Sequence, residues 1–242
     1  MTTHGIKGLL FDYDGVISSL MARVGWSYLY ALKKAKPDIK REVVNEALYS
    51  TAQKLLTTTE RLSPLYIPQI IAKVSNISGL NFFQKVKFVI TGVIMYNKCK
   101  MIVVPQPGAI DTLSLLAKDY KMGLVTSAKR ELINKASEQI PILKEFDVLI
   151  TREDCVYSKP HPEGILKGIK GLGLFASDCL YVGDMPSDVI ASRKANVKVI
   201  GILGEFKEIA QKSFESLKPD YIIPYLKDLP NLLRKIKGKE EM

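Results

Sequence analysis

The sequence predicts an α/β protein, with a doubly wound, mostly parallel sheet and an all-helical domain inserted after the first strand. Continuous apolar runs recur along the chain, which is typical of parallel strands buried on both faces. Helical patterns separate these runs, except between residues 16 and 101, where only helical patterns occur. The 242 residues, 47% of them hydrophobic, suffice for one large domain and an insertion. We therefore expect a core domain of residues 1–17 and 102–242 and a helical domain of residues 18–101.

The elements of the core domain follow in order along the chain. Strands are predicted at residues 6–11, 122–126, 148–151, 179–183, 197–203 and 221–223. Helices are predicted at residues 109–118, 129–139, 162–170, 188–194 and 227–236. Proline at the start of the helix after residue 161 suits a position whose N–H has no partner within the helix. This alternation indicates right-handed crossovers between parallel strands.

The inserted interval reads as a small helical domain. Helices are predicted at residues 26–33, 43–56, 67–74 and 82–95. The aromatic residues Trp26, Tyr28 and Tyr66 are interpreted as part of its core, because such residues are more often core than ligand contacts; the alternative is that they contact a ligand. Segments 16–21 and 101–108 would be the linkers, and they are plausible hinges if the inserted domain acts as a lid.

Two aspartates end the first apolar run, in the order Phe11-Asp12-Tyr13-Asp14-Gly15. Burying unpaired charge is costly, and carboxylates this close repel each other. A metal between them would explain the pair at the carboxyl end of a strand, where open α/β sheets bind ligands. The alternative interpretation is a turn, because Asp-Gly pairs commonly form turns. Gly15 would allow a tight bend after Asp14.

Three later segments also place polar residues near apolar runs. Thr126 and Ser127 end the run that starts at Gly123, and Lys159 precedes Pro160-His161-Pro162 between two predicted strands. Gly183 and Asp184 end the run from Cys179, and Asp188 follows four residues later. This order and spacing, from about residue 6 to residue 236, resembles the haloacid dehalogenase-like superfamily of phosphotransferases. The Gly-Asp-x-x-x-Asp and Lys-Pro-His-Pro pieces are specific together with the first motif, although each is weak alone.

The resemblance implies a helical cap at the position of the insertion and a division of catalytic work. Asp12 would be the nucleophile that forms an aspartyl-phosphate, and Asp14 the general acid and then base. Asp12, the backbone carbonyl of Asp14 and Asp184 would hold Mg²⁺, which prefers hard oxygen ligands. Asp188 would support these ligands. An equally weighted alternative makes Asp188 a carboxylate favoured by the dipole at a helix N-terminus.

The same resemblance assigns the phosphate contacts. Thr126 would donate its hydroxyl to a phosphate oxygen, with help from the N–H of Ser127 at a helix start. Alternatively Thr126 and Ser127 cap that helix, a role that Thr and Ser fill routinely. Lys159 would place its charge on the phosphoryl oxygens and on Asp12. His161 is interpreted as part of a structural turn.

The expected activity is Mg²⁺-dependent hydrolysis of a small phosphorylated metabolite, such as a phosphoglycolate-like compound or a sugar phosphate, as in capped phosphatases of this superfamily. A phosphomutase is the alternative enzyme, and a non-catalytic regulatory protein is a further alternative. Asp14 argues against dehalogenation. A phosphonate hydrolase that uses a cap lysine stays open, because the insertion contains several, including Lys33, Lys34, Lys54 and Lys73. A polar cluster at residues 58–61 could face the substrate, although Arg61 is interpreted first as a solvated surface residue.

Composition bounds the partners and the compartment. The net charge is +10, with a pI near 9.3. Because the lysines are scattered and dense only at residues 234–239, we expect neither nucleic acid nor membrane as a partner. Three separated cysteines indicate neither a disulfide framework nor a zinc site, and Cys179 is interpreted as a core residue. The first seven residues are too short for a signal peptide. We expect a cytoplasmic monomer or homodimer.

Overall fold

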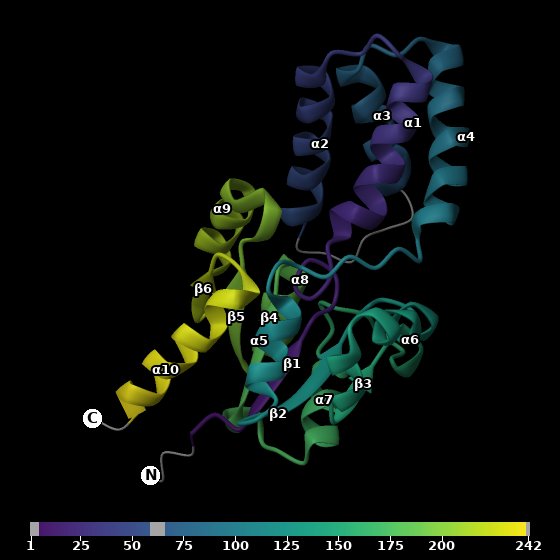
Figure 1. The fold of residues 1–242 in the computed structure, drawn as a ribbon. Helices are drawn as coiled ribbons and strands as arrows, with labels where there is room; N and C mark the ends of the chain where they lie inside the picture. Colours follow the sequence, from purple (N-terminus) through teal and green to yellow (C-terminus); the bar gives the residue numbers. More distant parts are fainter. Residues whose placement is uncertain (1–4, 59–65, 241–242) are drawn as a thin grey trace. The chain divides into compact units, whose positions relative to one another are not determined.

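A computed structural model of the chain describes residues 5–58 and 66–240 and contains one six-stranded parallel sheet (Figure 1). The strand order is β3-β2-β1-β4-β5-β6, so the order reverses direction between β1 and β4. The strands are β1 (Gly8–Phe11), β2 (Lys121–Val125), β3 (Val148–Ile150), β4 (Cys179–Gly183), β5 (Lys198–Ile202) and β6 (Tyr221–Ile223). Each predicted strand is present, with ends shifted by no more than two residues. The predicted doubly wound fold is confirmed.

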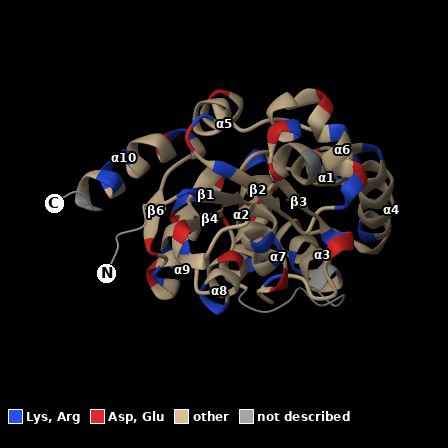
Figure 2. Ribbon diagram, turned by 90° about the horizontal axis from the view of Figure 1, so that it is seen from below, with Lys and Arg blue, Asp and Glu red and all other residues tan. Residues whose placement is uncertain are grey.

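Helices cover both faces of this sheet, as the turned view in Figure 2 shows. One face carries α5 (Ala109–Leu116), α6 (Arg130–Gln139) and α10 (Leu229–Glu240), and the other α7 (Glu163–Leu172), α8 (Pro186–Lys194) and α9 (Lys207–Leu217). Short 3₁₀ turns lie at Pro141–Glu145, Arg152–Asp154, Ala176–Asp178, Gly204–Phe206 and Leu226–Asp228. On the second face Leu10, Tyr181 and Phe214 belong to one buried apolar cluster, and Cys179 is buried there as predicted. The apolar runs thus form strands covered on both sides.

The described part of the inserted interval consists of helices joined by short loops. It contains a π-helical turn (Met21–Gly25) followed by α1 (Trp26–Ala35), α2 (Arg41–Leu56), α3 (Tyr66–Ile77) and α4 (Phe82–Cys99). Asn81 begins α4 with a reciprocal capping box, in which its side chain and that of Gln84 each accept the other's backbone N–H. The predicted inserted helical domain is confirmed.

The expectation that the aromatic residues of this domain are core is only partly correct. Tyr28 packs edge-on against Phe88, with ring centroids 5.6 Å apart, next to the buried cluster of this domain. Trp26 is 66% exposed, so its assignment to the core is wrong. The reason is position: Trp26 is the first residue of α1, and the residues that α1 buries are Ser27, Ala31, Leu32 and Ala35. The side chain of Tyr66 lies outside the described residues.

The chain divides into two compact units. One contains the described residues of 1–19 and 105–242, and the other the described residues of Leu20–Thr58 and Leu62–Val104. These junctions follow residues 19 and 104, whereas the sequence placed them after residues 17 and 101. Local pairing explains the shift: Ser18 forms a bridge with Pro105, and the N–H of Gln106 donates to the carbonyl of Ile17 at 2.8 Å. Within the described residues, no helix combines the length and apolarity that a membrane span requires.

Candidate active site

Asp12 lies where the strand order reverses, directly after β1. Its N–H donates to the carbonyl of Val182 in β4 at 2.9 Å, so the strand pairing continues to the aspartate itself. Its Oδ1 accepts the N–H of Tyr13 at 2.8 Å, and the residue is only 6% exposed. This reversal point at the carboxyl edge of a parallel sheet is the usual ligand position in such folds. The fold therefore presents a buried carboxylate at that edge.

Lys159 reaches the same place from the segment that precedes α7. Its Nζ lies 3.0 Å from Asp12 Oδ2 and 2.7 Å from Asp188 Oδ1, and all three side chains are at least nine-tenths buried. Since Asp12 follows β1 and Asp188 lies in the first turn of α8, one ammonium joins residues that are far apart in sequence. The structure brings together the predicted lysine and two of the predicted aspartates.

Three carboxylates meet beside this lysine. Oxygens of Asp12, Asp184 and Asp188 all lie within 4.8 Å of one another. Asp184 Oδ1 is buried without a hydrogen-bond partner, which is costly unless another group satisfies it. An oxygen-only set of this kind fits a hard cation such as Mg²⁺. The residues present therefore fit a metal site.

Asp188 lies in the first turn of α8, as its interpretation as a carboxylate at a helix N-terminus requires, and its support of metal ligands stays a prediction. Its Oδ2 accepts the N–H of Met185 at 3.0 Å, which caps α8, while its Oδ1 contacts Lys159.

Asp14 is half-buried in the turn after β1 and lies close enough to Asp12 to affect its ionisation. The group of three carboxylates found among the described residues does not include that of Asp14.

Two glycines make room for these carboxylates. Gly15 has φ +79°, and a Cβ built on it would lie 1.9 Å from Asp184 Oδ2. The predicted tight bend is therefore also a place where the backbone passes directly against a carboxylate. A Cβ on Gly183 would lie 2.5 Å from the side chain of Asp188. Any larger residue at either position would displace an aspartate.

The ionisation of the site reflects its excess of negative charge. Burial raises the pKa of Asp12 to about 7, with further upward contributions from Asp188 and Asp14 that Lys159 only partly opposes. Burial and the nearby Asp188 and Asp12 carboxylates also hold the pKa of Asp184 well above its usual range. Burial opposes the charge of Lys159, but Asp12 and Asp188 outweigh it and raise the pKa of Lys159 well above its ordinary value. One lysine does not neutralise three carboxylates, so a further cation would favour their ionised forms.

Thr126 and Ser127 precede α6 (Arg130–Gln139) and do not lie at its start, where the sequence analysis expected them. Thr126 is buried after β2, and its Oγ1 accepts the N–H of Ala128 at 3.0 Å, which leaves the hydroxyl hydrogen for donation. Ser127 is exposed, and α6 starts only at Arg130, with Lys129 as a cap residue that makes no side-chain cap bond. The placement of the Ser127 N–H at the helix start is therefore wrong, and so is the alternative that Thr126 or Ser127 caps the helix.

A side-chain contact explains the late helix start. The N–H of Arg130 donates to Glu153 Oε2 at 3.0 Å, and the N–H of Arg152 donates to the carbonyl of Ala128 at 2.9 Å. The turn after β3 therefore satisfies a donor at the start of α6, where an N-cap side chain would otherwise act. A partner this distant in sequence leaves no local signal.

Sequence reasoning missed Tyr181 in β4. Its hydroxyl accepts from Lys159 Nζ at 2.9 Å and lies 3.1 Å from the carbonyl oxygen of Val125. The available signal was a hydroxyl within an otherwise apolar buried run, Leu180-Tyr181-Val182.

His161 is in a turn, as predicted: its Nδ1 accepts the N–H of Glu163 at 3.3 Å. In the polar cluster, Thr58 donates to the carbonyl of Lys54, and residues 59–61 lie outside the described part.

Comparison with known proteins decides the family. The family model described as haloacid dehalogenase-like hydrolase matches residues 9–202, which include every candidate site residue above. The chain belongs to this family. The expected enzyme class, a hydrolase of the phosphatase type, is confirmed.

Named relatives and solved structures extend over nearly the whole chain. The pyrophosphatase PpaX of Oceanobacillus iheyensis is 25% identical over 93% of this chain and 95% of its own length. The pyrophosphatase PpaX of Bacillus velezensis is 28% identical, over 95% and 97% respectively. A predicted phosphoglycolate phosphatase from Haemophilus somnus superposes with TM-score 0.66 at 21% identity, covering 96% of this chain and 99% of that one. A putative β-phosphoglucomutase from Thermotoga maritima gives TM-score 0.69 at 14% identity, covering 95% and 99%. The two structural likenesses concern the fold alone.

Proposed function

We propose that this protein is a Mg²⁺-dependent phosphatase that hydrolyses a small phosphorylated metabolite through a covalent phosphate on Asp12. The observation that carries the proposal is the buried contact of Asp12 with Lys159, beside the oxygens of Asp184 and Asp188. A phosphate ester resists attack because its oxygens are negative, so a catalyst must supply both a fixed nucleophile and compensating positive charge. This site offers both within one buried cluster.

In the first step a carboxylate oxygen of Asp12 forms a bond to phosphorus, and the bond from phosphorus to the leaving oxygen breaks. Asp14 donates a proton to that leaving oxygen, so the product departs as a neutral alcohol or an acid. The hydroxyl of Thr126 donates to a phosphoryl oxygen, and the fixed positive charge of Lys159 beside Asp12 acts on the phosphoryl group electrostatically. In the second step Asp14, now ionised, removes a proton from water as the water oxygen attacks phosphorus. The bond between Asp12 and phosphorus breaks, which releases inorganic phosphate and restores the carboxylate.

Asp12, the carbonyl of Asp14 and Asp184 would hold Mg²⁺, with Asp188 as the supporting carboxylate. When bound, the ion supplies positive charge that stabilises the negative oxygens of the transferring group. The buried, unpartnered Asp184 Oδ1 supports this assignment. We also propose a cytoplasmic location, because Cys99, Cys155 and Cys179 are free thiols.

Two substrate classes deserve direct comparison. Phosphoglycolate-like compounds and sugar phosphates are monoesters that this chemistry accepts without modification. The names of the PpaX relatives add pyrophosphate, in which the leaving group is a second phosphate. The two classes differ in the charge of the leaving group and not in the step at Asp12, so activity measurements must separate them.

The test is release of inorganic phosphate from pyrophosphate, a sugar phosphate, phosphoglycolate and a phosphonate, with Mg²⁺ or with a chelator. Asp12→Asn should abolish release, whereas the matched control Asp119→Asn, at an exposed position before β2, should not change it. Metal-dependent release that requires Asp12 supports the proposal, and the ranking of substrates selects the class. Folded protein that binds Mg²⁺ but releases phosphate from none of these compounds would overturn it.

A further inference from the structure

We propose that Tyr181 is a positioning residue that fixes the ammonium group of Lys159 against Asp12. The inference rests on the proposed function for its catalytic consequence, but the contact itself can be tested without any activity. Neither the motif pattern nor the assigned roles includes this tyrosine.

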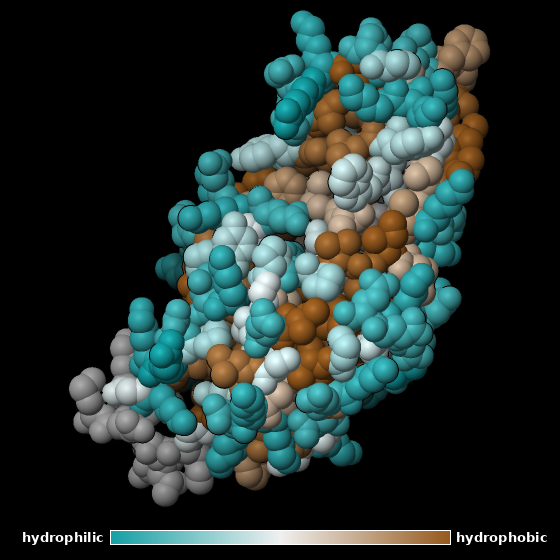
Figure 3. Space-filling model, viewed as in Figure 1, coloured by the Kyte–Doolittle hydropathy of each residue, from teal (hydrophilic) through white to brown (hydrophobic). Residues whose placement is uncertain are grey.

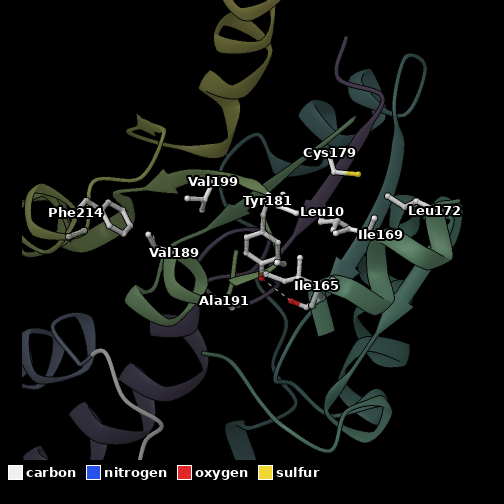
Figure 4. Close-up of a cluster of buried hydrophobic side chains, with 14 of the residues drawn as sticks. Leu10, Ile165, Ile169, Leu172, Cys179, Tyr181, Val189, Ala191, Val199 and Phe214 are labelled. Carbon is white, nitrogen blue, oxygen red and sulfur yellow. Dashed lines mark hydrogen bonds between the residues drawn. The ribbon is translucent and has the colours of Figure 1, made fainter. Parts of the chain in front are cut away.

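Tyr181 approaches the site from inside the sheet. It lies in β4 opposite Leu10 of β1 and is fully buried, and its ring stands within the apolar cluster shown in Figure 4. A buried hydroxyl needs hydrogen-bond partners. The partners of this hydroxyl are Lys159 Nζ, the Val125 carbonyl and Asp188 Oδ1, at 2.9, 3.1 and 3.2 Å. The Tyr181 hydroxyl is thus a polar atom that extends from the apolar core to Lys159.

The donors of Lys159 match its near acceptors in number. An ammonium group has three N–H bonds. Three oxygens lie within 3.0 Å of Nζ: Asp188 Oδ1 at 2.7 Å, the Tyr181 hydroxyl at 2.9 Å and Asp12 Oδ2 at 3.0 Å. The carbonyl of Val125 is further away, at 3.4 Å. The three near oxygens come from α8, β4 and the end of β1, so they hold the nitrogen from three elements.

The hydroxyl is well suited to this task because it is a neutral acceptor. As it accepts from Lys159, its own hydrogen can go to the Val125 carbonyl or to Asp188. Burial and the nearby Asp188 carboxylate raise the pKa of Tyr181 well above its ordinary value, so the hydroxyl keeps its proton. A carboxylate in place of this hydroxyl would add to the negative charge of Asp12 and Asp188 around Lys159, whereas a neutral hydroxyl does not.

Removing the hydroxyl should loosen the lysine without emptying the core. Tyr181→Phe keeps the ring, and the third N–H of Lys159 is left with the distant Val125 carbonyl. A lysine side chain has considerable rotamer freedom, so losing one of three anchors moves its charge away from a fixed position. Stabilisation of a transition state depends on charge held in place beforehand.

The kinetic test is a double-mutant cycle with Tyr181→Phe, Lys159→Met and the double variant, assayed on the best substrate of the panel. Tyr181→Phe should lower kcat by about tenfold, as expected for a lost hydrogen bond to a charged group, with KM within about twofold. In the Lys159→Met background the same change should cause no further loss, because the residue that it positions is absent. Equal losses in both backgrounds would indicate a merely structural role and overturn the proposal. Tyr221→Phe, in the edge strand β6, is the matched control and should leave kcat unchanged.

An NMR measurement tests the positioning role of Tyr181 independently of the proposed phosphatase function. In the unmutated protein, the ¹⁵N-labelled ammonium signal of Lys159, assigned by its loss in Lys159→Met, should show slow exchange of its hydrogens with water. The signal should shift or broaden in Tyr181→Phe but not in Tyr221→Phe. Exchange as fast as that of exposed lysines would overturn the positioning role, even if Tyr181→Phe failed to fold. If this signature is present but the protein releases no phosphate, the proposed function fails and the contact stands.

Discussion

At the scale of single residues, the site depends on how closely the backbone approaches carboxylates. Asp12, Asp184 and Asp188 share a volume in which their oxygens lie within 4.8 Å of one another. Gly15 and Gly183 leave the space for two of them, because each lacks the Cβ that would overlap an aspartate. The two glycines are therefore as much part of the geometry as the charged residues.

Gly15→Ala should weaken Mg²⁺ binding by at least about tenfold, since the added methyl group would displace Asp184. The change also carries a backbone cost of about 1–2 kcal/mol for a positive φ. Gly173→Ala is the matched control, because Gly173 has φ +66° with nothing within 4 Å of a built Cβ. Both variants should lose stability in chemical denaturation, but only Gly15→Ala should lose metal affinity in calorimetry. Equal metal affinity in the two variants would contradict this account of Gly15.

The ionisation of Asp12 predicts how the effect of Mg²⁺ depends on pH. Its folded-state pKa of about 7 lies above the unfolded value, so without metal its contribution to stability falls as pH rises from about 4 through 7. Mg²⁺ requires the ionised carboxylate and relieves this cost. The rise in Tm on adding Mg²⁺ should therefore be larger at pH 8 than at pH 5.5. In Asp12→Asn this difference should shrink; an equal rise at both pH values in the unmutated protein would argue against Asp12 as a ligand.

At the scale of elements, α4 has two unlike faces. Phe88 is 4% exposed and packs in the core of the helical unit, whereas Phe83 and Ile90 are 81% and 55% exposed. Figure 3 shows the resulting apolar surface along α4. The high apolar content of this helix therefore gives a poor guide to which residues stabilise the unit.

Substitutions in α4 should differ according to face. Phe88→Ala should cost about 3–5 kcal/mol of unfolding free energy, because it opens a cavity in the core of the helical unit. Phe83→Ala should change stability by no more than about 0.5 kcal/mol, because it removes an exposed side chain. Urea denaturation of the whole chain, followed by helical circular dichroism, measures both. Similar costs for the two variants would mean that α4 is oriented differently.

At the scale of the whole molecule, the positive charge is large but dispersed. The net charge is +10, and Figure 2 shows Lys and Arg along many helices, with Asp and Glu between them. Nucleic-acid binding requires basic residues gathered along a backbone-sized track. The strongest local role of a cation in the described structure is that of Lys159, which faces carboxylates and is buried.

We therefore expect no specific retention of single- or double-stranded oligonucleotides at physiological salt. Fluorescence anisotropy with labelled oligonucleotides at several salt concentrations measures this. Binding that falls steeply and linearly, on logarithmic scales, with added salt would show a phosphate-binding surface and contradict the expectation. A labelled neutral polymer of similar size provides the control for non-electrostatic association.

Local sequence patterns are sufficient to predict the sheet, the inserted helical domain and most of the candidate site residues. Apolar runs and their polar ends are local patterns, and parallel strands bring such ends to one edge of a sheet. The start of α6 at Arg130 and the contact of Tyr181 with Lys159 depend on partners far apart in sequence, and the exposure of Trp26 depends on which face of α1 packs. Such contacts form only when tertiary packing brings the side chains together. The periodic patterns of the sequence therefore do not predict them.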